Sequence, residues 1–393
     1  MEEKAAVELN MTQTSDLPAS LPALVAQRAA TDPAKAILRR KARGIWQTAT
    51  WSQLAEQVQR IGAGLHALGL GRDDAAMILA DTRPETAYAD IAVQSCGAAS
   101  VITHSDIEAT RVEQILRATG SRIAFVENEE QLDKILSVRQ RCPTLTRIII
   151  FDMKGLRELN DPHCVSLVQF ASEHHGYDWA EAARSVSGDC RALVLFAKDD
   201  PASAGQVLLQ RDVMGMIAEV RSRLVLTPQD ERLALLSMAD PVERIWGLYA
   251  AFDSGCISNY LEGPDTAIEN LQELQPTVLG ADAEVWAHLH ARTVQAAEGA
   301  TTVQRLLYDW ATGSVRRGGW GSWAADRLVL SAVRNELGLR RVRLAYTGGR
   351  AVSPPALDWA RCLGIHVRRI EGSDAVEDQC GEPGDPVMQR AHA

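Results

Sequence analysis

A lysine and two aspartates stand together in one short stretch of the chain, at Lys198, Asp199 and Asp200. They follow an apolar run at 191–197 that is typical of a buried strand, and a helical pattern begins at Asp212. A lysine in this position could hold an anion such as a phosphate. Each close aspartate would oppose that anion by roughly 4 kcal/mol at an effective dielectric constant of about 20. The residue types therefore favour a surface turn over an anion site that uses Lys198.

Two further stretches carry residue types that suit a ligand. Thr347-Gly348-Gly349 follows a predicted strand, and glycine permits the close backbone approach that a bound ligand needs, although such turns are common. Near the end of the chain, Asp374 follows Gly372 and stands close to further acidic residues. A carboxylate there could bind a metal ion, but an exposed acidic tail is the favoured interpretation.

The histidines and cysteines point to no metal or nucleophile site. His288 and His290 are two residues apart on a predicted helix, so they point to different faces. His174-His175 lies in a polar loop, and no Ser–His–Asp or Cys–His arrangement follows from the spacing. The seven cysteines are odd in number and form no CxxC pair. This usage favours reduced thiols in a cytoplasmic protein over a disulfide framework or a zinc site.

The composition is that of a soluble globular protein with two or more packed units. The chain has 393 residues, of which 46% are hydrophobic and 23% charged. A formal net charge of -10 argues against a nucleic-acid partner, because phosphate backbones bind basic faces. No apolar run is long enough for a transmembrane segment. The polar first residues show no signal-peptide pattern, and 1–17 is expected to form a disordered or loosely docked tail.

Strand and helix patterns alternate along most of the chain, which predicts an α/β fold with parallel sheets and helices on their faces. The stretch 152–189 is expected to be a connector, 302–323 to be irregular, and the chain after Gly372 to be polar and irregular. Predicted strands lie at 75–80, 123–127, 147–152, 191–197, 233–238, 257–260, 277–280, 342–346 and 366–370. Predicted helices lie at 52–68, 83–98, 112–118, 129–141, 212–224, 245–252, 266–273, 284–297, 325–337 and 354–363.

Four blocks of sequence, in order, are similar to the long-chain acyl-CoA synthetase (fatty acid–CoA ligase) branch of the adenylate-forming, or AMP-binding, superfamily. The last of them reads LVLSAVRNELGLRRVRLAYTGGRAVSP. The resemblance runs from about Pro18 to Gly372 and implies the large N-terminal domain of that family. The four blocks are Thr50–Glu85, Phe125–Asp152, Tyr260–Trp286 and Leu328–Pro354.

The resemblance also implies a domain organisation. Two α/β subdomains with flanking helices are expected at 18–188, which includes the connector, and at 189–375. A flexible tail follows at 376–393. The small C-terminal lid domain of the family, with the lysine that completes adenylation, is expected to be absent.

The reaction of the family joins a carboxylate to the α-phosphate of ATP, and it needs N–H donors, a lysine and Mg²⁺ around the phosphates. The resemblance therefore implies ATP and Mg²⁺ as cofactors. The family's Thr/Ser/Gly-rich phosphate loop, which ends in Pro-Lys-Gly, corresponds to 196–205 here. Only Gly205 matches it, and Ala204 stands at the lysine position.

The other family motifs are partly kept. The Leu-Ala-His segment becomes Met-Ala-Asp240, while Glu243 and Arg244 match and are interpreted as a structural pair at the start of a helix. Thr347-Gly348-Gly349 matches the turn that lies against adenine. The Tyr-Gly-x-Thr-Glu motif becomes Glu-Gly-Ser-Asp-Ala, which keeps its glycine but loses the ring and the glutamate. The implied remnants of the nucleotide cleft are Gly348, Gly349, Gly372 and Asp374, with Gly205 in the phosphate loop.

Three hypotheses follow. The leading one is a catalytically impaired synthetase-like protein that binds a long-chain acyl ligand or a protein partner. That partner could be a second copy of the same chain. The second is a working ligase with divergent residues and a lid supplied by another chain, and the third is a truncated relic.

Three tryptophans among glycines could line an acyl entrance, but local packing is favoured for them: Trp310, Trp320 and Trp323.

Overall fold

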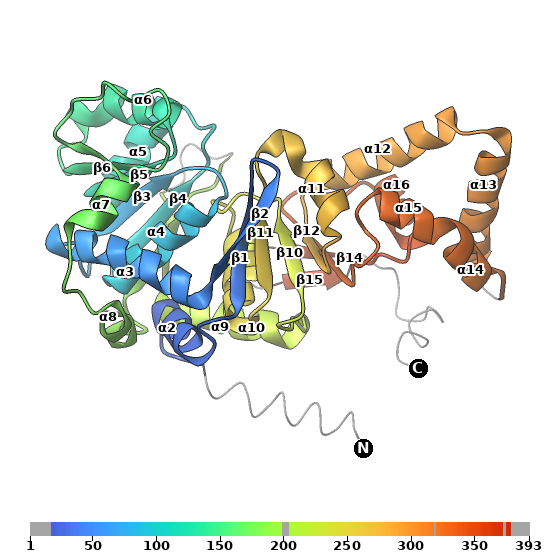
Figure 1. Cartoon of the computed structure of the whole chain (residues 1–393), viewed down its shortest axis with the longest axis horizontal. Coiled ribbons are helices and arrows are strands. Elements are labelled where there is room, and N and C mark those ends of the chain that lie inside the picture. The colour runs from blue at the N-terminus through green and yellow to red at the C-terminus, as the bar shows by residue number, and fades with distance from the viewer. Residues whose placement is uncertain (1–16, 199–203, 318–319, 372–374, 379–393) are drawn as a thin grey trace, which may run out of the picture. The chain divides into compact units, whose positions relative to one another are not determined.

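The computed structural model of the chain (Figure 1) describes residues 17–198, 204–317, 320–371 and 375–378. Its fold is α/β, as the alternating patterns predict, and parallel strand pairs dominate its sheets. The chain divides into two compact units. The first contains the described residues up to Gln229 together with Ser237–Glu262, and the second contains Asp230–Leu236 and the described residues from Gly263 onward.

A seven-stranded sheet forms the centre of the first unit, in the order β7-β6-β5-β3-β4-β8-β9. All neighbours are parallel except β8 and β9. Every residue of β3 and β4 is buried, because a parallel sheet is covered on both faces. The strands are β3 (Ala75–Leu79), β4 (Ala99–Thr103), β5 (Ile123–Val126), β6 (Arg147–Ile150), β7 (Cys164–Ser166), β8 (Arg191–Leu195) and β9 (Gln206–Leu209).

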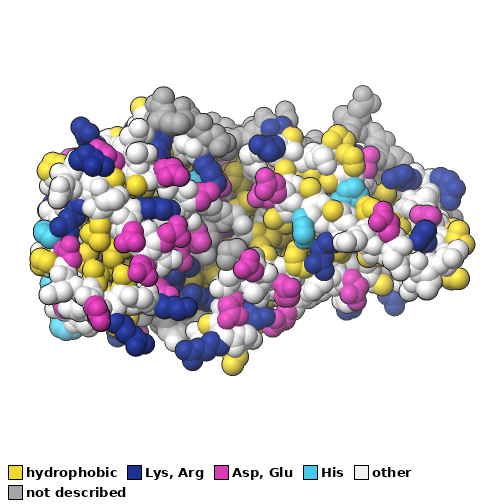
Figure 2. Space-filling model, turned by 90° about the horizontal axis from the view of Figure 1, so that it is seen from above, with side chains coloured by type: hydrophobic (Ala, Val, Ile, Leu, Met, Phe, Trp, Pro, Cys, Tyr) yellow, Lys and Arg dark blue, Asp and Glu magenta, His cyan; other side chains and the backbone are white. Residues whose placement is uncertain are grey.

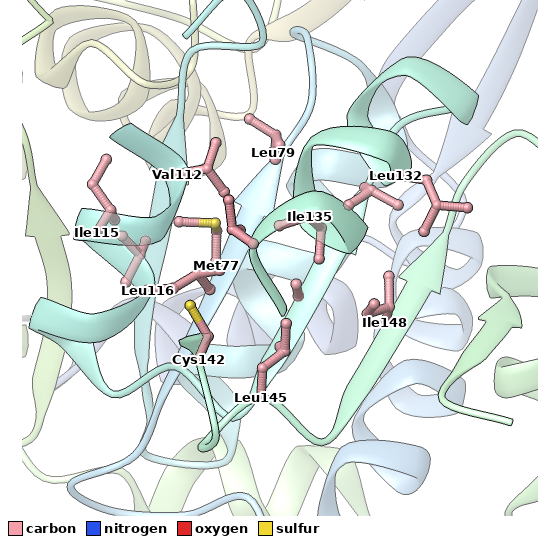
Figure 3. Packing of buried hydrophobic residues seen from close by; sticks show 14 of the residues in the cluster. Met77, Leu79, Val112, Ile115, Leu116, Leu132, Ile135, Cys142, Leu145 and Ile148 are labelled. Atoms are coloured by element: carbon pink, nitrogen blue, oxygen red, sulfur yellow. The ribbon is translucent and has the colours of Figure 1, made fainter. Parts of the chain in front are cut away.

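A buried apolar cluster joins this sheet to α5 (Ala109–Thr119) and α6 (Glu129–Val138), as Figure 3 shows. Local signals set the helix ends. The side chain of Asn128 accepts a hydrogen bond from the Gln131 N–H at the start of α6, and Gly120 ends α5 with a φ of 62°. The cluster includes Met77, Leu79, Val112, Ile115, Leu116, Leu132, Ile135, Cys142, Leu145 and Ile148.

Helix α3 (Trp51–Ala67) begins with a capping box. The Thr50 hydroxyl accepts from the Gln53 N–H at 3.3 Å, and the Gln53 side chain accepts from the Thr50 N–H at 2.9 Å. Gly64 lies on the buried side of this helix. A Cβ there would lie 2.5 Å from the ring of Phe170, so only glycine allows the ring to approach this closely.

The stretch predicted as a connector, 152–189, instead contains β7 and two helices, α7 (Leu167–Glu173) and α8 (Trp179–Ser185). Each of these helices has only seven residues, too few for a recognisable apolar period. Tertiary contacts hold them in place. The Trp179 indole is buried and donates to the Ser95 hydroxyl at 2.7 Å.

The sequence patterns also missed a hairpin formed by β1 (Ala36–Ala42) and β2 (Ile45–Thr50). Its two turn residues, Arg43 and Gly44, have φ angles of 52° and 74°, as a tight two-residue hairpin turn requires. The β1 strand also pairs in parallel with β11 (Ile257–Tyr260). The strand β4 was missed as well, although it begins directly after the predicted helix 83–98.

The remaining helices of the first unit cover its sheet and strands (Figure 1). A positive φ of 77° at Gly97 separates α4 from β4. The segment predicted as a helix at 245–252 is a π-helix, η2, followed by a short α-helix. The bounds are α2 (Leu21–Thr31), α4 (Pro84–Ser95), α9 (Gln210–Arg223), η2 (Val242–Tyr249) and α10 (Ala250–Ser254).

The second unit contains five strands in the order β15-β14-β13-β12-β10. They are parallel except for β14 and β15. The segment β15 corrects the prediction that the chain is irregular after Gly372, since pairing with β14 imposes a strand on a polar sequence. The strands are β10 (Glu231–Ala234), β12 (Val278–Gly280), β13 (Leu344–Gly348), β14 (Val367–Glu371) and β15 (Ala375–Asp378).

The stretch 302–323, predicted to be irregular, is mostly helical. It forms α13 (Thr302–Arg317) and the beginning of α14 (Trp320–Ala325). The prediction was wrong because it gave weight to the glycines after residue 312 and overlooked the helical spacing of the apolar residues before them. The other helices of this unit are α11 (Ala267–Leu274), α12 (Ala283–Gly299), the π-helix η4 (Asp326–Leu330), α15 (Ser331–Glu336) and α16 (Pro354–Cys362).

Candidate functional site

The carboxyl ends of β4 and β8 in the first unit are where a parallel α/β sheet ordinarily binds a ligand. Lys198, just after β8, donates a hydrogen bond to the Asp106 carboxylate beyond β4 at 2.8 Å. This hydrogen bond is the main cause that holds the pKa of Asp106 below its ordinary value. Both side chains are largely exposed, so the pair contributes little to stability, but it gives the Lys198 ammonium an anionic partner within the protein.

Gly205 lies at the other end of the same loop. Its φ is 83°, and a Cβ there would lie 2.7 Å from the Phe196 ring. The Phe196 ring in turn lies under the Arg111 guanidinium, 5.5 Å from the ring centroid. Backbone conformation and packing therefore account for the glycine without a phosphate. Between these residues, Asp199 and Asp200 lie outside the described part of the chain.

His104 is a residue that the sequence reasoning missed. It comes directly after β4, and its Nε2 lies 3.4 Å from the Asp240 carboxylate. The histidine is mostly buried, with 13% of its side chain exposed, whereas Asp240 is 47% exposed. Asp240 stands where the resembling family has a histidine, so an imidazole from another strand end lies beside that position. The sequence signal that could have identified His104 was its position directly after the buried strand β4.

Arg244 is fully buried on η2 and pairs with Asp90 of α4, whose side chain is also fully buried. The Arg244 Nε donates to the Tyr249 hydroxyl at 2.8 Å, and its Nη2 donates to the Ser100 hydroxyl at 2.7 Å. The Tyr249 hydroxyl donates to Asp90 Oδ2 at 2.7 Å, and the Gln94 amide donates to Asp90 Oδ1 at 3.0 Å. The interpretation of Arg244 as structural agrees with this buried network.

Burial governs the electrostatics of this network. Burial is the largest single effect on the pKa of Arg244 and lowers it, but the Asp90 carboxylate and the Tyr249 hydroxyl together outweigh burial, and the pKa lies above its ordinary value. Burial also raises the pKa of Tyr249 well above 10, because a phenolate would be desolvated there. The arginine is therefore charged and the tyrosine neutral, and neither is exposed to a ligand.

In the second unit, the turn Thr347-Gly348-Gly349 follows β13 as predicted. Gly349 has a φ of 70°, and a Cβ there would meet no atom within 4 Å, so the space beside it is open. The Thr347 side chain is buried, and its hydroxyl has no hydrogen-bond partner among the described residues. The Arg369 guanidinium donates to the Gly349 carbonyl at 3.4 Å. The other predicted cleft residues of this unit, Gly372 and Asp374, lie outside the described residues.

Near this turn, the structure reveals a contact that the sequence did not indicate. Gly280 at the end of β12 pairs with Tyr346 of β13. A Cβ at Gly280 would lie 2.4 Å from the Tyr346 ring, which therefore crosses over the glycine. The ring packs within the sheet, where it is 1% exposed.

The remaining chemical residue types do not assemble into a site. Within the described ranges, no group of three or more His, Cys, Asp or Glu side chains could hold a metal ion. His290 packs against the Trp359 ring at a centroid distance of 5.6 Å. The sequence favoured local packing for the tryptophans. Trp310 is 40% exposed and is therefore covered only in part, whereas Trp323 is 72% exposed, which contradicts local packing for that residue. The Trp320 side chain lies outside the described residues.

Comparisons with known proteins agree with this architecture. The model of the family described as AMP-binding enzyme matches residues 25–188. A long-chain-fatty-acid–CoA ligase, ACSBG2 of Xenopus laevis, is 22% identical over 83% of this chain and 47% of its own length. The chain is a relative of the AMP-binding enzymes. A second ligase, FadD15 of Mycobacterium tuberculosis, is 24% identical over 83% of this chain and 56% of its own length.

Solved structures share the fold of this chain. The anthranilate CoA ligase AuaEII, in complex with anthranoyl-AMP, superposes with a TM-score of 0.69 at 15% identity, over 91% of this chain and 61% of its own. The N-terminal domain of FACL13 from Mycobacterium tuberculosis gives a TM-score of 0.64 at 15% identity, over 89% and 75%. The chain spans about half the length of the curated relatives named above.

Proposed function

We propose that this chain is a long-chain acyl-CoA synthetase-like protein that binds an acyl ligand and is impaired in adenylation. The observation that carries the proposal is the loop after β8. Its lysine, Lys198, pairs with Asp106 at 2.8 Å, and Ala204 stands where the resembling family has its own lysine. A loop of this kind lacks the free cation that would offset charge on a transferring phosphate.

The sequence does not favour Mg²⁺·ATP as the ligand. Magnesium in such sites is held by one or two carboxylates together with phosphate oxygens, and Ala375 stands where the resembling family has the glutamate of its Tyr-Gly-x-Thr-Glu motif. The acidic network around Asp90 is neutralised internally by Arg244 and closed to ligands. The turn at Gly349 has open space beside it, and the buried Thr347 hydroxyl two residues earlier has no hydrogen-bond partner among the described residues. A flat or extended ligand could approach that backbone closely without a magnesium ion.

The acyl part of the proposal is supported by the relatives. Those named above are fatty-acid–CoA ligases, and their names describe a long-chain substrate. We extend to this chain only the acyl group, because the chemistry of its loop departs from adenylation. The subdomains 18–188 and 189–375, and a protein partner or a second copy, are further parts of the proposal.

Two measurements test the proposal. Calorimetric titration with a non-hydrolysable long-chain acyl-adenylate analogue, with free fatty acid and with ATP·Mg²⁺ should give heat for an acyl compound and none for ATP·Mg²⁺. Mass spectrometry of a reaction with fatty acid, ATP and Mg²⁺ should detect no acyl-AMP. Lys198→Met serves as the matched variant. It should leave acyl binding unchanged, because the lysine is already held by the Asp106 carboxylate.

Each outcome has a definite meaning. Formation of acyl-AMP by the wild-type chain, abolished in Lys198→Met, would show a divergent working ligase and refute the impairment. Ala204→Lys tests the same point from the other side, since an adapted working site should gain little from it. Absence of heat with every acyl compound would refute ligand binding and leave a partner-binding protein or a relic.

A further inference from the structure

Helix α13 carries four large apolar side chains in solvent. The exposed fractions are 65% for Val303, 64% for Leu306, 47% for Leu307 and 40% for Trp310. These positions follow the i, i+3, i+4, i+7 spacing, which places them on one stripe of the helix. A stripe of this kind ordinarily faces a protein core. Because all four side chains of this stripe are exposed, the stripe is a candidate surface for binding an apolar partner.

Positive charge coincides with this stripe. Arg317 follows Trp310 by seven residues, so it lies at the end of the same helix face, next to Arg316. The segment 292–328 contains five arginines against one glutamate and two aspartates, a formal charge of +2. The whole chain has a formal charge of -10. The apolar stripe therefore lies in a basic segment of an acidic protein.

We propose that the exposed face of α13, the stripe Val303–Leu306–Leu307–Trp310 ending at Arg317, docks on a bilayer surface that contains anionic lipids. Amphipathic helices with leucine and tryptophan on their apolar face lie in the plane of the headgroups, and an arginine at the end of that face can keep its charged group among the headgroups. Tryptophan is enriched at that depth. At the end of the molecule where Figure 1 places α13 and α14, Figure 2 shows hydrophobic side chains among basic and acidic ones.

The same observations argue against two other modes of contact. No helix in the described parts of the chain is long and apolar enough to cross a membrane, so the contact is with the surface of the bilayer. A second copy of the chain is a poorer occupant. Four side chains on two helical turns offer much less than the ~800 Å² that each partner contributes to a standard stable interface. The proposal does not depend on acyl binding.

The test is flotation of the full chain with vesicles of phosphatidylcholine, with and without phosphatidylglycerol. The wild-type chain should float with the anionic vesicles and not with the neutral ones. Leu306→Glu should weaken binding by roughly tenfold or more, because it places a negative charge in the apolar face. Arg316→Gln with Arg317→Gln should weaken it by roughly tenfold or more, since each lost arginine near the surface counts for about fivefold.

Val168→Glu on α7 is the matched control, because Val168 is 80% exposed but stands outside this stripe. It should bind like the wild type. Circular dichroism should show Leu306→Glu to be folded, since the side chain is in solvent. The proposal is overturned if the wild type ignores anionic vesicles, or if Leu306→Glu and Val168→Glu bind alike. Sedimentation velocity that shows a lipid-free dimer dissolved by Leu306→Glu would assign the stripe to a second copy instead.

Discussion

Arg244→Met should be among the most destabilising single substitutions in the chain. The change removes the guanidinium from a site that is fully buried on both sides of its ion pair with Asp90. The Asp90 carboxylate would then keep only neutral donors, the Tyr249 hydroxyl at 2.7 Å and the Gln94 amide at 3.0 Å. An uncompensated carboxylate inside a protein is costly because it cannot regain its hydration.

The expected magnitude follows from this geometry. Removing one partner of a buried pair costs about 3–5 kcal/mol in the free energy of unfolding. The two neutral donors that persist favour the lower half of that range. Since domains of this kind are stable by only about 5–15 kcal/mol, the loss should move a urea unfolding midpoint strongly. Far-UV circular dichroism in urea at neutral pH measures it.

Two further variants serve as controls for Arg244→Met. Arg60→Met removes an exposed arginine that pairs with Glu56 on α3, and it should cost less than about 0.5 kcal/mol. Adding Asp90→Asn to Arg244→Met should recover about 1 kcal/mol or more, because the stranded charge disappears. The reasoning is wrong if Arg244→Met costs no more than Arg60→Met, or if Asp90→Asn destabilises the Arg244→Met protein further.

Three other substitutions test packing and burial. Gly64→Ala should destabilise by about 1–3 kcal/mol, because its Cβ would lie 2.5 Å from the Phe170 ring. Gly215→Ala on α9, where a Cβ meets nothing within 4 Å, should instead stabilise by up to about 1 kcal/mol. Urea midpoints that move in the same direction for both would contradict this. Burial, with a smaller effect of Glu85, raises the pKa of Tyr88 to about 12. The unfolded phenol therefore loses its proton first as the pH rises, and the folded state loses about 1 kcal/mol between pH 9 and pH 11. Tyr88→Phe should lack that part of the loss; equal pH dependence in both proteins would refute the assignment.

The sequence alone determined the fold class and most of the helices and strands. Local periodicity predicted β3, β5 and β8, since an unbroken apolar run is what a strand covered on both faces requires. The family resemblance also came from sequence, because long blocks keep their order. The sequence equally showed Ala204 at the family's lysine position, since that requires no contact. The prediction that 302–323 is irregular was wrong, although the helical spacing of its apolar residues was present in the sequence.

The tertiary structure alone decided which side chains meet. Lys198 and Asp106 are 92 residues apart, and Arg244 and Asp90 are 154 apart, so no local pattern links them. His104 follows β4 and Asp240 precedes η2, so only the tertiary structure places their side chains 3.4 Å apart. The exposure of the α13 stripe was also invisible in sequence. An amphipathic pattern specifies that a face is apolar, and only the packing of the other helices decides whether that face is covered.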